Sequence, residues 1–348
     1  MGQDLGHLQS ETRRGLTVAG HVTVLVPSFN HGKYIRERID SILGQTYQDF
    51  DLVVIDDRSS DDSDQIIKEL QSRHGFRYLR NETNSGTPFA AWERIGEIAH
   101  GEFIWVCESD DVAEPHFLET AIRAFEKNPQ AVLFYSNSLV IDQAGVAIGH
   151  TETYFRETWK ESRWDHDFVV DGPEELRAFQ MRGQIVPNMS SAVIRTDAFR
   201  QAFRPFLKQL KLTGDWLFIG DVLSHGDAIF CHQALSRFRK HEVTARVRVK
   251  SARSQAEFIL TKYLLFRSAK LPQKEFATLM GPDVVRFLYE PASLWAVFRA
   301  LLSISLVHTL GAVFLLMRSM VSNRHLLGKF MWRLNHSRNY LKGKHDGD

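Results

Sequence analysis

The sequence predicts an α/β fold in which a Rossmann-like, mostly parallel sheet is flanked by helices and followed by a C-terminal helical region. Short β-branched runs alternate with amphipathic segments of helical length over 22–136, a pattern typical of βαβ units. The length of 348 residues predicts about two domains. With 43% hydrophobic and 24% charged residues, the composition excludes a disordered chain, a collagen-like repeat, a disulfide scaffold and a polytopic membrane protein.

Each element has its own justification in the sequence. The first strand, 22–27, is a β-branched run that stops at a proline, and the strands 51–55 and 102–107 both end on acidic residues. The helix 34–43 carries isoleucine and leucine at helical spacing, and the other helices are predicted in the same way. The remaining predicted strands are 76–79, 131–136, 193–194 and 228–238, and the remaining helices are 63–72, 88–99, 115–127, 216–224 and 256–268.

The N-terminus and the cysteines favour a cytoplasmic protein. Residues 1–20 are polar and lack the apolar core of a secretory signal, so we expect a flexible tail. Cys107 and Cys231 lie in apolar runs and form no CxxC motif, which indicates buried thiols in a reducing compartment. The segment 270–282, with two prolines and a glycine, is the best candidate for a linker.

The segment 300–317 contains no Lys, Arg, Asp or Glu. As a helix it would reach roughly 27 Å, which is marginal for crossing a membrane. Residues 318–348 hold seven basic and two acidic residues, a net charge of +5 that leaves −4 for residues 1–317. With the rest of the chain in the cytoplasm, a span would place this basic tail outside the cell, against the preference of basic segments for the cytoplasmic side. We therefore expect a helix packed in the protein or dipping into one leaflet, with the tail on anionic lipid. The alternative is a buried helix in the core or in a homo-oligomer.

The total charge of +1 provides no basic surplus for phosphate contacts, so we expect no nucleic-acid partner. The sequence has no GxGxxG after its first strand and no GxxxxGK[ST], which disfavours a dinucleotide dehydrogenase and a P-loop NTPase.

Polar clusters follow three of the predicted strands, at 27–30, 56–59 and 108–111. Ligands of open parallel sheets bind at the carboxyl ends of the strands. Glu108 and Asp110 would share one face if the strand continued, and two such carboxylates repel unless a cation lies between them. The clusters therefore indicate a divalent cation that bridges carboxylates and phosphates, whereas any single cluster alone is also typical of a polar turn.

The segments VTVLVPSFNHGKYI, LVVIDDRSSDDS and GEFIWVCESDD resemble family 2 glycosyltransferases with the GT-A fold. Two downstream elements, LTGDW at 212–216 and FRKH at 238–241, follow in the order of that family. The resemblance implies a GT-A domain over 21–245, with a nucleotide-sugar half at 21–140, an acceptor half at 141–245 and a helical region at 246–348. It further implies inverting transfer from a nucleoside-diphosphate sugar, most often a UDP-sugar, to a glycan or lipid-linked acceptor in cell-envelope or extracellular polysaccharide synthesis.

The resemblance also implies roles for individual residues. Asp215 would be the catalytic base, and Asp110 and His241 would bind Mn²⁺ or Mg²⁺. Asn188, Ser190 and Trp216 would lie on the acceptor side. The residues implied in donor binding are Pro27, Phe29, Asn30, Asp56, Asp57, Glu108, Ser109, Asp110 and Asp111.

Two residues depart from the family pattern. Glu108 replaces the usual first aspartate of the DxD element, and Glu93 stands where many relatives have asparagine. Glu108 therefore keeps open the alternative of a catalytically silent nucleotide-binding or scaffold module, whereas the retained Asp215 favours an enzyme. Purely structural roles also remain open for three residues. Asp215 could cap a helix, and Trp159 and Trp164 could pack in the core instead of stacking on sugar rings.

Overall fold

The structure is a computed structural model that describes residues 18–241, 251–272, 276 and 291–322. The predicted N-terminal tail, the linker 270–282 and the basic tail lie mostly outside the described residues.

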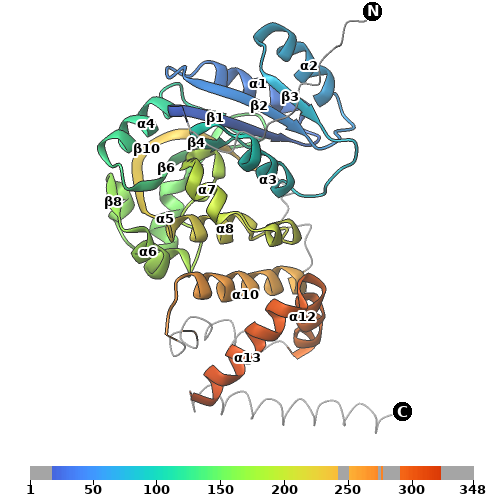
Figure 1. Ribbon diagram of the computed structural model, residues 1–348, viewed down its shortest axis with the longest axis vertical. Helices are drawn as coiled ribbons and strands as arrows, with labels where there is room; N and C mark the ends of the chain where they lie inside the picture. The colour runs from blue at the N-terminus through green and yellow to red at the C-terminus, as the bar shows by residue number, and fades with distance from the viewer. Residues whose placement is uncertain (1–17, 242–250, 273–275, 277–290, 323–348) are drawn as a thin grey trace, which may run out of the picture.

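A ten-stranded mixed sheet runs through the α/β domain in the order β3-β2-β1-β4-β9-β6-β10-β5, with β7 paired to β6 and β8 to β10 (Figure 1). The first four main strands are parallel, as predicted, and so is the pair β6–β10. The stub predicted at 193–194 is β9, which runs antiparallel between β4 and β6 and makes the sheet mixed. The strands are β1 Val18–Ser28, β2 Phe50–Asp56, β3 Arg77–Arg80, β4 Gly101–Val106, β5 Val112–Ala113, β6 Ala131–Ile141, β7 Ala147–His150, β8 Phe168–Val170, β9 Ala192–Arg195 and β10 Asp227–Arg239.

Helices cover both faces of the sheet, so alternate residues of one strand enter two different cores. Val24 of β1 belongs to the core shared with α1, α2 and α4, whereas Leu25 belongs to the core shared with α3, α7 and α8. This two-sided burial explains the continuous apolar runs of the central strands. The helices of the domain are α1 Gly32–Leu43, α2 Ser63–His74, α3 Phe89–Ile98, α4 Phe117–Lys127, α5 Thr151–Trp159, α6 Gly172–Glu175, α7 Thr196–Ala202 and α8 Gly214–Leu223.

Local signals explain where the elements end. Helix α2 stops at Gly75, which has a φ of +74°, the left-handed conformation that glycine adopts without steric cost. The predicted buried thiols are confirmed, since Cys107 and Cys231 are both buried and free. Trp164 is also fully buried and stacks on Phe155 with ring centroids 4.9 Å apart, which is a packing role.

The C-terminal helices pack onto the α/β domain. Helix α10 Ser251–Ser268 lies against α8, and α12 Pro291–Ile304 and α13 Leu306–Ser322 lie against α10 (Figure 1). Thr261 Oγ1 donates to Thr213 Oγ1 at 2.7 Å, a buried contact that joins α10 to the residue before α8.

The expectation of one helix over 300–317 is wrong, because the structure breaks it at Ser305. The hydroxyl of Ser305 accepts from the backbone N–H of His308 at 3.4 Å, so Ser305 caps the start of α13. Among the described residues, no helix is both long enough and apolar enough to cross a membrane. The side chains of this segment lie partly in the core and partly on the surface. Ile304 and Ala312 are buried, whereas Val307 and Phe314 are exposed.

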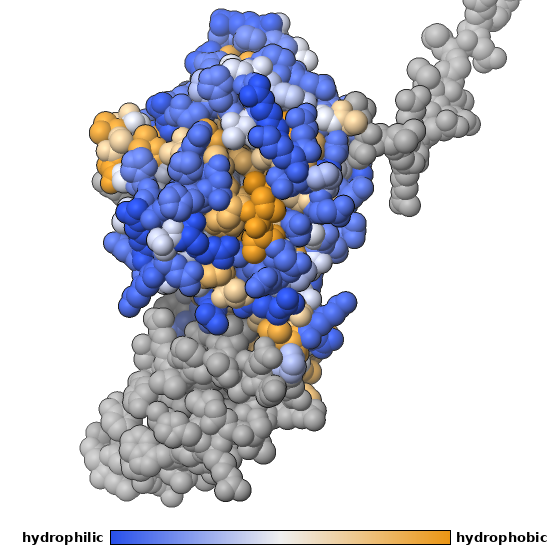
Figure 2. Space-filling view, turned by 90° about the vertical axis from the view of Figure 1, so that its left-hand side faces the viewer, coloured by the Kyte–Doolittle hydropathy of each residue, from blue (hydrophilic) through white to orange (hydrophobic). Residues whose placement is uncertain are grey.

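Figure 2 looks onto the side of the molecule that lies on the left in Figure 1. Its surface is mostly hydrophilic, with apolar areas near the centre of the face and at its upper left edge. This is the surface expected of a domain that buries its apolar side chains between sheet and helices.

Candidate active site

A pocket of about 360 Å³ opens at the carboxyl ends of β1, β2 and β4, the edge where the sequence placed its polar clusters. Of the residues implied in donor binding, Pro27, Phe29, Asp57, Glu108, Ser109 and Asp110 line it. The Phe29 side chain is exposed and lines the pocket. Another wall is formed by residues of the segment from Asn81 to Thr87, which the sequence reasoning did not single out.

Asp57 holds that wall in place. Its carboxylate accepts from Asn81 Nδ2 at 2.7 Å, and from the backbone N–H and the hydroxyl of Ser85 at 2.8 Å. Asp56 is fully buried and accepts from the backbone N–H of Ser59 at 3.0 Å and from Arg80 Nε at 3.2 Å. Both aspartates therefore shape the pocket through the loops that surround it, and only Asp57 borders it.

Asn30 ties the first two loops together and does not line the pocket. It adopts a φ of 55°, a conformation that asparagine tolerates better than most residues. Its backbone N–H donates to Ser59 Oγ at 2.9 Å, and its Oδ1 accepts from the backbone N–H of Ser60 at 2.8 Å.

Glu108, Asp110 and Asp111 form an acidic cluster whose ligand oxygens all lie within 4.8 Å of one another. Burial raises the pKa of Glu108 well above its ordinary value, and the charges of Asp111, Asp110 and Asp215 raise it further. Burial, followed by the charge of Asp110, raises the pKa of Asp111 to about 7. The carboxylates of the cluster thus repel one another, and carboxylate oxygens are the ligands that Mg²⁺ and Mn²⁺ prefer.

Two histidines face the acidic cluster. His241 Nε2 lies 2.6 Å from Asp110 Oδ2, and His31 Nδ1 lies 2.7 Å from Ser109 Oγ. The two imidazoles stack with centroids 6.0 Å apart. Burial alone would raise the pKa of Asp110, but the hydrogen bond with His241 and the positive charge of both imidazoles lower it below its ordinary value.

Two arginines also border the cluster, and neither was assigned a role from the sequence. Arg38 is completely buried, lies 5.2 Å from the centre of the Trp105 ring, and lowers the pKa of Glu108 and Asp111 by its charge. The backbone N–H of Arg239 donates to Asp111 Oδ1 at 2.8 Å, and its Nε donates to the Asp110 carbonyl at 2.7 Å. Arg239 precedes His241 by two residues at the end of β10, so strand alternation could have placed both on one face.

Asn188 and Ser190 support the acidic cluster through buried hydrogen bonds. They are 3% and 0% exposed, so neither borders open space. Ser190 Oγ accepts from the Glu108 backbone N–H at 2.9 Å and donates to Asp111 Oδ2 at 2.7 Å, while Asn188 Oδ1 accepts from the Ser190 N–H. Asp111 is likewise buried, so its carboxylate fixes the loop instead of lining the pocket.

Asp215 stands in the first turn of α8 and is the only residue of that helix that is not buried. Its Oδ1 accepts from the Trp216 N–H at 2.8 Å, and its charge raises the pKa of Glu108, which places it near the acidic cluster. Trp216 is 4% exposed and donates through its indole to the Gln180 carbonyl, so its side chain packs in the core.

The C-terminal helix α10 supports the chain before Asp215. Glu257 is fully buried, and its Oε2 accepts from the backbone N–H groups of Lys211 and Leu212 at 2.9 and 2.8 Å. Glu93, the second departure from the family pattern, pairs with Lys208 at 2.6 Å on the same side of the domain.

Comparisons with known proteins show what this chain is similar to. The family described as "Glycosyl transferase family 2" matches residues 23–192. The glycosyltransferase GlyG of Streptococcus pneumoniae serotype 4 is 30% identical over 112 residues, which cover 32% of this chain and 37% of that protein. The poly(ribitol-phosphate) beta-N-acetylglucosaminyltransferase TarS of Staphylococcus aureus (strain Mu50) is 31% identical over 142 residues, 40% of this chain and 24% of that protein. The chain therefore spans well under half the length of either of these curated relatives.

Solved structures show the same fold. The crystal structure of S. aureus TarS 1-349 in complex with UDP-GlcNAc has a TM-score of 0.65 to this chain at 18% identity, covering 93% of this chain and 92% of that one. The similarity confirms the predicted GT-A fold and extends past the α/β domain into the C-terminal helices.

Proposed function

The chain belongs to glycosyltransferase family 2, and from that premise we propose that it moves a sugar from a UDP-sugar to a hydroxyl group of a glycan or lipid-linked acceptor. One observation carries the proposal: the pocket at the strand ends, the acidic cluster and Asp215 lie at the same edge of the sheet. The donor would bind in the pocket, between the exposed ring of Phe29 and the wall held by Asp57.

Within this proposal, residues 21–245 are the catalytic domain, with the donor half at 21–140 and the acceptor half at 141–245. The C-terminal region 246–348, of which the structure describes helices α10, α12 and α13, would be the extension of this domain. The proposed pathway is synthesis of a cell-envelope or extracellular polysaccharide.

A divalent cation fits the acidic cluster, because three carboxylates gather within 4.8 Å and two of them, Glu108 and Asp111, have raised pKa values. Glu108 and Asp110 would hold Mn²⁺ or Mg²⁺ beside His241, since the carboxylate of Asp111 is already bonded to Ser190 and Arg239. When bound, the cation neutralises charge on a nucleoside diphosphate leaving group.

The chemistry of this chain is then an inverting single displacement. The acceptor oxygen forms a bond to the anomeric carbon while the bond from that carbon to the diphosphate oxygen breaks. Asp215, whose carboxylate stands outside the core at the start of α8, takes the proton of the acceptor hydroxyl.

We propose further that α13 rests on an anionic membrane surface at the cytoplasmic face, where a lipid-linked acceptor would be found. Leu306, Val307, Leu310 and Phe314 are 57–76% exposed and follow helical spacing along one face. The sequence after them carries the net charge of +5, which complements anionic lipid.

The alternative is a silent nucleotide-binding module, and one assay separates it from the enzyme. Release of the nucleoside diphosphate is measured with a panel of sugar nucleotides and acceptor extracts, with and without Mn²⁺. The proposed function predicts metal-dependent release with one donor of the panel. Donor binding without release under every condition would support the silent module and overturn the transferase.

A further inference from the structure

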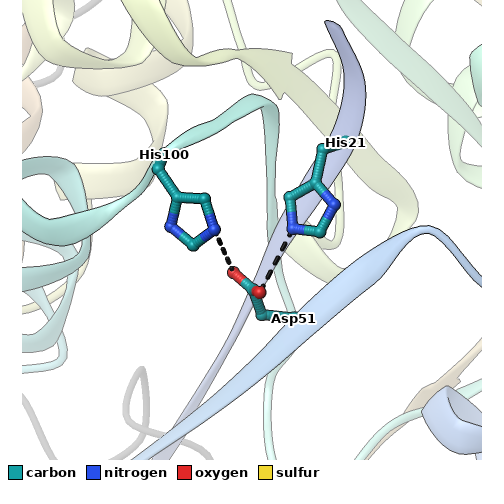
Figure 3. A group of neighbouring side chains, drawn as sticks. All are labelled: His21, Asp51 and His100. Carbon is teal, nitrogen blue, oxygen red and sulfur yellow. Dashed lines mark ion pairs between the residues drawn. The ribbon is translucent and has the colours of Figure 1, made fainter. Parts of the chain in front are cut away.

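Three side chains with metal-binding atoms meet at the edge of the sheet opposite the active site (Figure 3). His21 lies near the start of β1, Asp51 near the start of β2, and His100 directly before β4. Val22 is paired with both Phe50 and Phe103, so these strands begin side by side. The strand β1 separates this edge from the active site by roughly 20 Å at about 3.3 Å per residue.

The distances in this group suit a tetrahedral ion. His21 Nε2 lies 3.2 Å from Asp51 Oδ1, and His100 Nε2 lies 3.5 Å from Asp51 Oδ2. Two ligands of Zn²⁺ at about 2.0–2.1 Å stand about 3.3 Å apart when the angle between them is tetrahedral. Figure 3 shows both imidazoles directed at the same carboxylate, each from a different segment of the chain.

His21 is already oriented as a ligand. Its Nδ1 lies 2.6 Å from Asp49 Oδ1, so the tautomer with a proton on Nδ1 is favoured, which leaves a lone pair on Nε2. The His21 side chain is 13% exposed, and Nε2 is buried without a hydrogen bond to any described residue. A lone pair on Nε2 is repelled by the Asp51 carboxylate oxygen at 3.2 Å, and a cation held between the two atoms relieves that repulsion.

The surroundings can accept an added positive charge. Asp49 and Asp51 contribute two carboxylates, and Glu102 accepts from the Gly20 N–H nearby and pairs with Arg195. A hollow of about 420 Å³, lined in part by Asp51, His74, Arg77 and His100, gives an ion access and leaves space for water as a fourth ligand. The His100 side chain is 58% exposed and has room to turn toward the ion.

We propose that His21, Asp51 and His100 bind one Zn²⁺ ion, with Asp49 as the positioning residue for His21. Two imidazoles and a carboxylate are a donor set that favours Zn²⁺, whereas the acidic cluster of the active site favours Mg²⁺ or Mn²⁺. Bound there, the ion joins the beginnings of three neighbouring strands and stabilises the folded domain by mass action.

The test is a Zn²⁺ titration of the full chain after treatment with a chelator. A chromophoric competitor reports the free ion, and excess Mg²⁺ occupies the carboxylate site. We expect one tight equivalent of Zn²⁺, its loss in His100→Ala, and its retention in His74→Ala, an exposed histidine of the same hollow. Equal binding by the wild type and His100→Ala, or equal loss in both variants, would overturn the proposal.

A second readout addresses geometry and the role of Asp49. Co²⁺ in place of Zn²⁺ should give the intense visible absorption of a four-coordinate ion, which His100→Ala removes. Asp49→Asn should weaken Zn²⁺ affinity about 10- to 100-fold while keeping the stoichiometry of one. If Asp49→Asn binds as tightly as the wild type, Asp49 does not position His21.

Discussion

The serine behind the acidic cluster offers the sharpest test of the site's architecture. Ser190→Ala removes one hydroxyl that accepts from the buried Glu108 N–H and donates to the buried Asp111 carboxylate. Each buried group left without its partner costs about 1–3 kcal/mol, so the loss of both predicts a fall of about 2–6 kcal/mol in the free energy of unfolding. Urea denaturation measures this fall directly.

Ser191→Ala is the matched control. Ser191 is equally buried, but its hydroxyl only donates to the Asn188 carbonyl, which also accepts from the Ser191 backbone N–H. We therefore expect a loss of about 1 kcal/mol or less for this variant.

A functional readout separates the role of Ser190 from simple destabilisation. Its hydrogen bond lowers the pKa of Asp111, so the pKa of Asp111 should rise in Ser190→Ala. Because the deprotonated carboxylate fixes the loop through Arg239, the acidic limb of the pH profile for turnover should move to higher pH. If Ser190→Ala and Ser191→Ala lose the same stability and show the same pH profile, the bridge from Ser190 to the acidic cluster does not organise the site.

The remaining predictions concern the base, a buried carboxylate and α13. Asp215→Asn should lower transfer by at least about 10³-fold while the donor dissociation constant, measured by calorimetry, changes little; near-normal turnover would contradict the assignment. Burial raises the pKa of Asp221 to about 6 in the folded protein, above its ordinary value of 3.8, so the stability it contributes at low pH is lost as the pH rises from about 4 to 6. Asp221→Asn should flatten that slope, a difference on the order of 2–3 kcal/mol, in thermal melts at pH 4 and 7; an unchanged slope would refute it. Leu310→Asp with Phe314→Asp should abolish sedimentation with anionic vesicles, and equal sedimentation of the wild type and this double variant would exclude α13 as the docking face.

The sequence predicted the strands and helices of the donor half because their patterns are strong and local. The run at 22–27, for example, became part of β1, and Ser28 and Phe29 directly after it border the pocket. It did not predict the direction of β9, since so short a strand carries too little pattern to reveal antiparallel partners in β4 and β6. The break at Ser305 was missed for a similar reason, because a single capping hydroxyl interrupts an otherwise uniform apolar run.

Side-chain direction was the harder part of the site to predict. Asn188 and Ser190 were expected to face an acceptor, but they turn inward because the Glu108 N–H and the Asp111 carboxylate need buried partners there. Arg38 and His31 escaped notice because each lies on or before a helix whose apolar pattern dominates the segment. Only long-range packing brings them to the loop after β4, which is distant from both in the sequence.

The geometry around Glu108 bears on the choice between an enzyme and a silent module. A glutamate carries its carboxylate one methylene further from the backbone than an aspartate. This extra length would displace the carboxylate from the cluster if the backbone lay where an aspartate requires it. Here the Glu108 N–H is held by Ser190, and the carboxylate still lies within 4.8 Å of those of Asp110 and Asp111. Its pKa rises partly through Asp110, Asp111 and Asp215, so it shares one electrostatic site with the proposed metal ligand and the proposed base. Burying these carboxylates together adds repulsion, which Arg38 and His241 offset in part and a bound cation would relieve further. The longer side chain therefore weighs less against catalysis than the sequence suggested.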